Sequence, residues 1–351
     1  MKRIAIAGLG KIGLFHLSIL RNIPSVELAG LVDANPAVQK IVRGMGIKLP
    51  FFASVPDLLA KENVNGVFAC VPPAFNPSIA QACIPKGIAL FVEKPMAADL
   101  EGARTMEALL KSQKTPPANA VGYMVGHSPI FIKVREILKS GELGQIEIYS
   151  ASILLGEVFK KQEGWRQNPK ISGGGAVAVL GSHLLYLIQS FLGMPKTIQA
   201  KMTRLYSMVE DIADIEFTHE GFRGNIKISW SEPDCPDIAI RIKVKGSKAE
   251  LHIEENRVTI LKKANGQGQI FYPWDLPPEP CERLKVRPAR EGYASQDISF
   301  VDSIGTGKKN LVSWLEGFEV QRLIEGIYKS AAARTALAVP QSCYGRTPES
   351  K

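Results

Sequence analysis

The sequence predicts an α/β protein with two domains: a doubly wound parallel sheet, then an α+β unit with a large, open, mainly antiparallel sheet. Three observations support this fold class. A glycine motif follows the first apolar run, strand-like and helix-like segments alternate up to about residue 122, and short strands then succeed one another over 197–262 without intervening helices. A chain of 351 residues exceeds one ordinary core, so we expect domains at 1–123 and 124–351.

The first 33 residues hold the most specific local pattern. Residues 3–7 form an apolar, strand-like run, Gly8, Gly10 and Gly13 follow with GxGxxG spacing, and Asp33 ends the next strand, 20 positions after Gly13. The first glycine allows a tight turn, the second lets the backbone approach a pyrophosphate, and the third lets the helix pack closely on the strand. Free N–H groups at the start of that helix would hold the pyrophosphate. The sequence therefore predicts a Rossmann domain that binds a dinucleotide.

Asp33 also bears on the choice of dinucleotide. Its carboxylate would accept hydrogen bonds from the ribose hydroxyls and would repel a 2′-phosphate. Ala34 and Asn35 supply no positive charge to offset that repulsion, although Lys40 or Arg43 could reach the site. We therefore expect NAD as the cofactor in preference to NADP.

The rest of the first domain follows a βαβ rhythm. Strands are expected at 28–32, 66–71, 88–92 and 118–123, and helices at 36–45, 76–86 and 100–112. Asn76 is expected to cap its helix, with Pro77 at the first helical position. Gly87 is expected to end that helix.

The second domain begins with helical patterns and continues with strands. Helices are expected at 129–140 and 176–192, and strands at 146–154, 212–217, 224–230, 238–244, 249–253 and 258–261. Residues 263–292, with five prolines, predict an extended loop. The last helix, expected at 310–333, is amphipathic enough to pack back onto the first domain.

Composition excludes several classes of protein. The apolar fraction of 45% and the charged fraction of 22% are typical of a folded globular chain. No segment predicts a membrane span or a signal peptide, and five scattered cysteines without CxxC spacing indicate a reducing compartment, so we expect a cytoplasmic protein. The five histidines show no metal-ligand pairing, and we expect no metal. The net charge of +9 is dispersed, which argues against nucleic acid but could favour an anionic small substrate.

Lys94 is an unusual residue for the end of a buried strand. In open α/β sheets the ligand lies outside the carboxyl ends of the strands, and Lys94 stands there, followed by Pro95. Beside a nicotinamide ring its pKa would fall, and it could bind a substrate hydroxyl and exchange its proton. The alternative is a lysine that pairs with Glu93, and position alone does not decide between them. The predicted cofactor-binding residues belong to the glycine motif or to strand ends: Gly8, Gly10, Lys11, Ile12, Gly13, Asp33, Val71, Pro72, Glu93 and Lys94.

Four motifs occur in a characteristic order along the chain. They are the glycine motif, Glu93-Lys94-Pro95, Gly164-Trp165-Arg166 leading to Ser172-Gly173-Gly174-Gly175, and Gly181-Ser182-His183. Together they resemble the glucose–fructose oxidoreductase/inositol dehydrogenase/rhizopine catabolism family (Gfo/Idh/MocA) over essentially the whole chain. The resemblance implies oxidation or reduction of a secondary alcohol of a sugar, cyclitol or nucleotide sugar with a nicotinamide cofactor. It also implies that Lys94 is the catalytic lysine, with a cis bond to Pro95 allowed.

Three positions depart from the family pattern. Val179 replaces the aspartate usually found four residues before the histidine, Tyr186 replaces an acidic residue three positions after it, and Gly126 stands where an arginine is frequent. A hydrophobic residue at position 179 cannot bind a sugar hydroxyl through its side chain. We therefore expect a substrate pocket that is less polar than usual, or one arranged around different groups.

The remaining candidate residues each have a structural alternative. His183 would hydrogen-bond the substrate oxygen and assist Lys94 as acid/base, or it could be a core histidine bonded to a backbone carbonyl. Arg166 would bind a carboxylate, a phosphate or the cofactor, or it could pack on the surface against Trp165. Tyr123 and Tyr186 are further substrate-binding candidates.

These observations predict an oxidoreductase that moves a hydride between NAD(H) and a sugar-like alcohol or ketone. Val179 motivates an alternative, an NAD-binding sensor or regulator without hydride chemistry. A third hypothesis retains bound NAD for an elimination in which the hydride leaves and returns. An exposed antiparallel sheet favours a homodimer or homotetramer.

Overall fold

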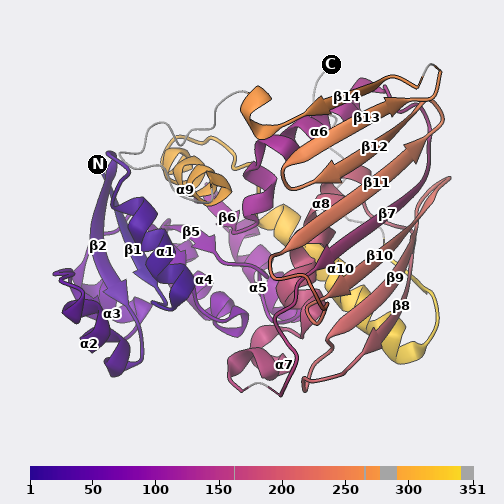
Figure 1. Cartoon of the computed structure of the whole chain (residues 1–351). Helices are drawn as coiled ribbons and strands as arrows, with labels where there is room; N and C mark the ends of the chain where they lie inside the picture. Colours follow the sequence, from indigo (N-terminus) through magenta and orange to yellow (C-terminus); the bar gives the residue numbers. More distant parts are fainter. Residues whose placement is uncertain (162, 265, 277–290, 341–351) are drawn as a thin grey trace.

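The computed structural model describes residues 1–161, 163–264, 266–276 and 291–340, and two sheets organise them (Figure 1). Cys281, Cys343 and half of the loop predicted over 263–292 lie outside the described residues.

The first sheet has six strands, all parallel: β1 (Lys2–Ala7), β2 (Val26–Val32), β3 (Phe51–Phe52), β4 (Gly66–Ala69), β5 (Ala89–Val92) and β6 (Asn119–Val121). Its helices are α1 (Lys11–Leu20), α2 (Pro36–Gly44), α3 (Val55–Lys61), α4 (Asn76–Cys83) and α5 (Leu100–Lys111). The strand order β3-β2-β1-β4-β5-β6 changes direction between β1 and β4. This is the topological switch point of a doubly wound sheet, where ligands bind, and the predicted fold class of this domain is confirmed.

Two local predictions in this domain need correction. Strand β3 and helix α3, which lie between α2 and β4, were not predicted, and a strand of two residues is too short to show an alternating pattern. Asn76 does not cap α4: the helix begins at Asn76 itself after Phe75, and the Asn76 side chain is fully buried. The buried Asn76 amide instead donates hydrogen bonds to the carbonyl oxygens of Glu93 and Met96 at the candidate site.

The second sheet has nine strands: β7 (Ile146–Leu154), β8 (Thr197–Thr203), β9 (Ile212–Thr218), β10 (Arg223–Ser229), β11 (Ala239–Gly246), β12 (Ala249–Glu254), β13 (Arg257–Lys262), β14 (Gly268–Phe271) and β15 (Leu337–Ala338). Their order is β14-β13-β12-β11-β7-β10-β9-β8-β15, antiparallel except for the pair β7 and β10. Helices α6 (Pro129–Ser140), α7 (Pro169–Ser172), α8 (Ser182–Leu192) and α10 (Trp314–Ala333) belong to this half of the chain. Figure 1 shows α6, α8 and α10 on the side of the sheet that faces the first domain.

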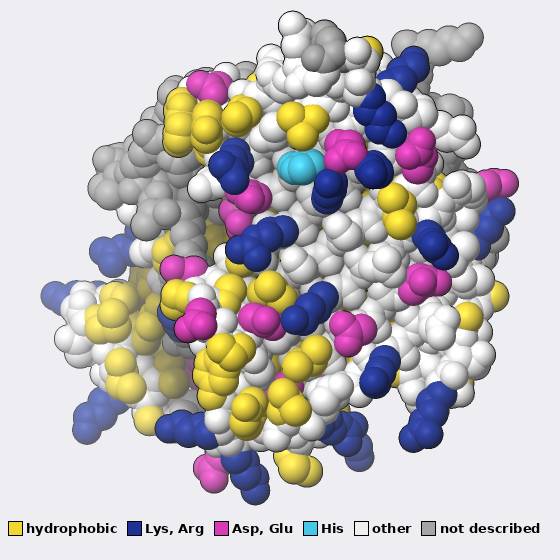
Figure 2. Space-filling view, turned by 45° about the vertical axis from the view of Figure 1, so that its right-hand side comes forward, with side chains coloured by type: hydrophobic (Ala, Val, Ile, Leu, Met, Phe, Trp, Pro, Cys, Tyr) yellow, Lys and Arg dark blue, Asp and Glu magenta, His cyan; other side chains and the backbone are white. Residues whose placement is uncertain are grey.

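The opposite face of this sheet is open. Strand β11, for example, alternates buried and exposed residues, so one row of its side chains enters the core and the other faces outward. Figure 2 shows charged groups of both signs scattered over this side of the molecule. The homodimer or homotetramer expected from such a face stays a prediction.

The C-terminal part of the chain returns to the first domain. Helix α9 (Glu291–Ser303) buries Tyr293, Phe300 and Val301 in a cluster with apolar residues of β1 and α1. Helix α10 contacts α5 and β6 of the first domain as well as α8 and β8 of the second. Helix α9 was not predicted. The loop predicted over 263–292 is wrong at 268–271, where β14 is mostly exposed and therefore lacks a hydrophobic alternation.

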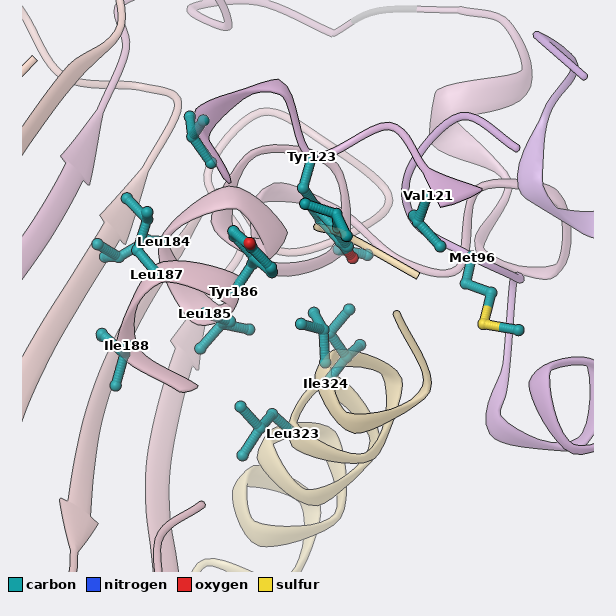
Figure 3. Close-up of a cluster of buried hydrophobic side chains, with 14 of the residues drawn as sticks. Met96, Val121, Tyr123, Leu184, Leu185, Tyr186, Leu187, Ile188, Leu323 and Ile324 are labelled. Carbon is teal, nitrogen blue, oxygen red and sulfur yellow. The ribbon is translucent and has the colours of Figure 1, made fainter. Parts of the chain in front are cut away.

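The core between the two sheets contains a long apolar segment. Figure 3 shows side chains of α8 and α10 gathered with Met96 and Val121 of the first domain. The segment Pro169–Leu192 is long and apolar enough to cross a membrane, but 83% of its most apolar window is buried inside the protein. Such burial is typical of a core helix.

Candidate active site

The glycine turn after β1 is shaped by contacts that leave no room for side chains. Gly8 has a φ of +88°, and a Cβ there would lie 2.5 Å from the carbonyl oxygen of Cys70. A Cβ on Gly13 would lie 1.9 Å from the carbonyl oxygen of Gly8. Among the described residues, and apart from its own chain neighbours, nothing lies within 4 Å of the Cβ position at Gly10. Helix α1 therefore begins tightly against the end of β1, with open space at its first N–H groups.

The other predicted residues of this half surround the same turn. Lys11 is exposed and Ile12 is half-buried at the start of α1. Val71 and Pro72 follow β4 and are half-buried, and the Val71 side chain lies beside Gly8. All four positions lie at the carboxyl edge of the first sheet.

Asp33 is oriented toward the glycine turn by main-chain donors. The Leu9 N–H donates to Asp33 Oδ2 and the Asn35 N–H donates to Asp33 Oδ1, each at 2.9 Å. These bonds hold the half-buried carboxylate at the end of β2, on the same edge as Gly8. An anionic acceptor in this place is suited to vicinal hydroxyl groups.

The segment Glu93-Lys94-Pro95 directly follows β5, and its Lys94–Pro95 bond is cis. The buried Asn76 amide donates to the carbonyl oxygens of Met96, at 3.1 Å, and Glu93, at 3.4 Å. Asn76 therefore ties α4 to this turn, a contribution that a local capping pattern could not reveal.

Lys94 reaches from the first domain to the second. Its Nζ donates to the main-chain carbonyl oxygen of Val179 at 2.7 Å, while the Glu93 carboxylate bonds His16 and the Lys94 N–H. The alternative of a lysine bonded to Glu93 is therefore not the arrangement found. Although the side chain at position 179 is apolar, its carbonyl still supplies an acceptor that orients Lys94.

The surroundings of Lys94 favour its neutral form. Burial lowers the pKa of Lys94, and the positive charge of Arg166 lowers it further. Glu93 and Glu157 act in the opposite direction, and the net result is a pKa below the ordinary 10.5. A lysine tuned in this way can exchange a proton nearer to neutral pH.

His183 lies near the start of α8 and is 5% exposed. Its Nδ1 has no hydrogen-bond partner among the described residues, so the backbone bond expected of a purely structural histidine is not seen at this atom. Burial and the nearby charge of Lys94 hold the pKa of His183 well below 6.5. The imidazole is therefore neutral at neutral pH.

One cavity of about 140 Å³ brings three of the predicted residues together. Lys94, Arg166 and His183 all line it. The other lining residues share a mainly apolar character and are Leu155, Glu157, Val158, Gln167, Val179, Leu180, Trp230 and Ile238. Arg166 also lies over the Trp165 ring, 4.8 Å from its centroid, as the structural alternative expects, and its binding of a carboxylate, a phosphate or the cofactor stays a prediction.

Sequence reasoning missed Glu157, Gln167 and Trp230. Gln167 directly follows Trp165-Arg166 and could have been found by extending that motif. Trp230 comes from the end of β10, where its Nε1 donates to Asp211 at 2.7 Å. No local pattern marks Glu157 or Trp230, because tertiary folding alone brings these strand ends to Lys94.

The glycine run that precedes α8 and His183 is tightly packed. Gly174 has a φ of +138°, and a Cβ there would lie 1.7 Å from the Tyr328 hydroxyl. The buried Glu210 carboxylate accepts hydrogen bonds from the Gly175 N–H, the Val177 N–H and the Tyr328 hydroxyl. The chain then makes a π-helical turn (Val177–Gly181) before α8. The Val179 carbonyl of this turn binds Lys94, and both Val179 and His183 of α8 line the cavity.

Tyr123 and Tyr186 do not line this cavity. Their rings stack 5.0 Å apart in the core, and the Tyr186 hydroxyl accepts a hydrogen bond from Arg135 at 3.3 Å. A Cβ on Gly126 would lie 2.5 Å from that hydroxyl, so the small residue at 126 makes room for the large one at 186. The role of the two tyrosines as substrate contacts stays a prediction.

Within the described residues, no group of three or more His, Cys, Asp or Glu side chains could hold a metal ion.

Two family models match this chain. Residues 2–119 match the model described as "Oxidoreductase family, NAD-binding Rossmann fold", and residues 131–252 match the "GFO/IDH/MocA C-terminal domain". Together they span most of the chain.

Curated proteins and solved structures show the same likeness. The putative UDP-kanosamine synthase oxidoreductase subunit of Amycolatopsis mediterranei is 27% identical over 269 residues, which is 70% of this chain and 73% of that protein. Inositol 2-dehydrogenase of Rhizobium meliloti is 22% identical over 347 residues, with 96% and 99% covered. A levoglucosan dehydrogenase in complex with NADH superposes with a TM-score of 0.85 at 16% identity, covering 97% of this chain and all of that one.

Proposed function

The chain belongs to the Gfo/Idh/MocA family of oxidoreductases, and from this premise we propose that it transfers a hydride between NAD(H) and a secondary alcohol or ketone of a sugar-like substrate. Lys94 is the principal acid/base and His183 assists it. The observation that carries the proposal is the shared cavity, into which the ends of β5 and of the glycine run bring these two groups. The cavity's remaining polar groups, Glu157, Arg166 and Gln167, offer both donors and acceptors to a polyhydroxylated ligand.

The first domain fits the cofactor that this family uses. A side chain at Gly8 or Gly13 would collide with main-chain atoms, whereas the space around Gly10 at the start of α1 is open, as a pyrophosphate requires. The Asp33 carboxylate is aimed at the same edge. When bound, NAD supplies the carbon that accepts or releases the hydride.

Lys94 and His183 have different roles at the substrate oxygen: Lys94 exchanges the proton and His183 forms a hydrogen bond. In the direction of alcohol oxidation, the neutral Lys94 amine takes the hydroxyl proton as the hydride leaves the substrate carbon. In the direction of reduction, the protonated amine returns it. The neutral His183 donates or accepts a hydrogen bond at the same oxygen without carrying a charge of its own.

A substrate panel tests this proposal. The protein is incubated with NAD⁺ and a set of sugars, cyclitols, sugar acids and nucleotide sugars, and nicotinamide absorbance reports reduction. Activity with one substrate class supports the proposal. Tight NAD binding with persistent inactivity over the whole panel would instead favour a sensor that performs no hydride transfer.

The pH dependence of alcohol oxidation is expected to show one rising limb. Because burial and Arg166 lower the pKa of Lys94, the base form accumulates at a pH below the ordinary 10.5, and kcat rises through that pKa. Reduction needs the protonated form and shows the opposite slope. The pKa of His183 lies well below 6.5, so no second inflection is expected near that pH. An inflection near 6.5 that disappears in His183→Gln would contradict this assignment.

The exchange Asp33→Asn is expected to weaken selection of NAD over NADP. The variant loses the negative charge that repels a 2′-phosphate, and we expect the ratio of the two dissociation constants to change by about tenfold, close to 1.4 kcal/mol. Calorimetric titration of NAD⁺ and NADP⁺ measures this ratio. Glu101→Gln is the matched control, because this exposed carboxylate on α5 lies outside the predicted cofactor residues. An unchanged ratio in Asp33→Asn would remove Asp33 from the cofactor site.

A further inference from the structure

A buried cluster of three ionisable groups lies behind Lys94. His16 stands between two carboxylates: its Nδ1 is 2.8 Å from Asp297 Oδ2, and its Nε2 is 3.0 Å from Glu93 Oε1. The side chains of His16 and Asp297 are fully buried, and that of Glu93 is 11% exposed. The hydride-transfer proposal uses neither His16 nor Asp297.

Three separate elements contribute to this cluster. His16 lies on α1, the helix that begins at the glycine turn, Glu93 follows β5, and Asp297 lies on α9. The rings of Phe68, Phe91 and Tyr293 surround the imidazole with centroids 5.2 to 6.0 Å from its own. A carboxylate buried in such apolar surroundings is costly unless it is protonated or paired with a positive group. Burial raises the pKa of Asp297, while the charge and hydrogen bond of His16 act in the opposite direction.

The orientation of Glu93 is the important consequence. Its Oε1 is directed to His16 and its Oε2 accepts the Lys94 N–H at 3.2 Å, while the Lys94 ammonium group extends away to the Val179 carbonyl. A carboxylate next in sequence to a lysine would otherwise be its natural partner. In this protein the Glu93 carboxylate is hydrogen-bonded to the His16 imidazole instead.

We propose that His16, held by Asp297, is a positioning residue for Lys94: it fixes the Glu93 carboxylate and offsets its negative charge, so that Glu93 anchors the Lys94 backbone without pairing with the Lys94 ammonium group. The inference rests on the proposed role of Lys94 in hydride transfer. Through Asp297, helix α9 from the C-terminal part of the chain thus helps to position Lys94 of the first domain.

The electrostatics agree with this geometry. Burial alone would lower the pKa of His16, but the charges and hydrogen bonds of Asp297 and Glu93 overcome it and raise the pKa to about 10. The imidazole is therefore protonated at neutral pH. The Cys70 thiol also faces the cluster, and burial together with Glu93 and Asp297 raises its pKa, so it stays neutral.

Glu93 acts on the pKa of Lys94 as well as on that of His16. Burial lowers the pKa of Lys94, Glu93 raises it, Arg166 lowers it and Glu157 raises it, whereas the neighbouring His183 is neutral. On this proposal, removing the positive charge of His16 leaves the negative charge of Glu93 uncompensated, and we expect the pKa of Lys94 to rise. Removing the negative charge of Glu93 must lower it.

Two glutamine variants of the 351-residue chain test the inference. The rate at which acetic anhydride acetylates Lys94 is followed against pH by mass spectrometry of the peptide that contains it, which gives the pKa of the amine without any substrate. We expect His16→Gln to raise this pKa by about one unit and Glu93→Gln to lower it by about one unit. His219→Gln is the matched control, because it removes a buried, neutral imidazole that bonds Tyr149 in the second domain, and should leave Lys94 unchanged.

Opposite shifts in the two variants distinguish positioning from a merely structural role. Shifts in the same direction, or no shift in a His16→Gln protein that keeps its thermal unfolding transition, would overturn the inference. If His16→Gln does not fold, Glu93→Gln alone decides, since an unchanged or raised pKa contradicts the proposal. Turnover of a Lys94 variant is a separate measurement. The proposed function can therefore fail while the pKa shifts of Lys94 are found, and the pKa shifts can be absent while the proposed function holds.

Discussion

Replacing Lys94 with alanine is expected to lower kcat by about 10²–10⁴-fold, the range that general acid–base catalysis contributes. The variant loses the amine that exchanges the substrate proton, and no other amine lines the cavity among the described residues. The dissociation constant of NAD⁺ should change little, because the glycine turn and Asp33 are untouched. Steady-state kinetics and calorimetric titration of NAD⁺ measure the two quantities.

The controls for this prediction use two further lysine variants. Lys94→Arg keeps a positive charge but cannot deprotonate at accessible pH, so it should remain as inactive in oxidation as Lys94→Ala. Lys170→Ala removes an exposed lysine from the nearby α7 and should retain full turnover. Normal turnover of Lys94→Ala would eliminate the proposed acid/base.

The exchange Gly13→Ala is expected to damage both NAD binding and stability. An alanine Cβ would lie 1.9 Å from the Gly8 carbonyl oxygen, so α1 must move away from the end of β1. Such overpacking typically costs about 1–3 kcal/mol of unfolding free energy. The displaced helix start would also present its N–H groups less well to the pyrophosphate, with a loss of NAD⁺ affinity of at least about tenfold.

Gly44→Ala is the matched control for this steric effect. Gly44 also lies in a helix, at the end of α2, and in the part of the chain that the structure describes no atom outside its own helix turn and chain neighbours lies within 4 Å of its Cβ position. Since alanine is the better helix former, this variant should be as stable as the parent or slightly more stable. Denaturant unfolding and NAD⁺ titration of both variants provide the comparison, and equal behaviour would mean that the contact at Gly13 relaxes without consequence.

The family resemblance and the fold class followed from short-range patterns. The glycine motif, the strand-ending Glu93-Lys94-Pro95 and the alternating strands of the second sheet each lie within a few residues, so a single chain displays them. The expectation of a less polar substrate pocket stays a prediction: the cavity lining includes Arg166, Gln167 and Glu157 beside Lys94 and His183, together with six apolar or aromatic side chains.

By itself, the sequence determined the cofactor half of this protein, because a dinucleotide site is built from consecutive turns at the edge of one sheet. Only the tertiary structure decided what surrounds Lys94. The Val179 carbonyl comes from a π-helical turn 85 residues away, and Asp297 is 281 residues from the histidine that it holds. Residues so distant in sequence meet only when packing brings their helices and strands together. A main-chain carbonyl acceptor cannot be recognised from the type of residue that supplies it.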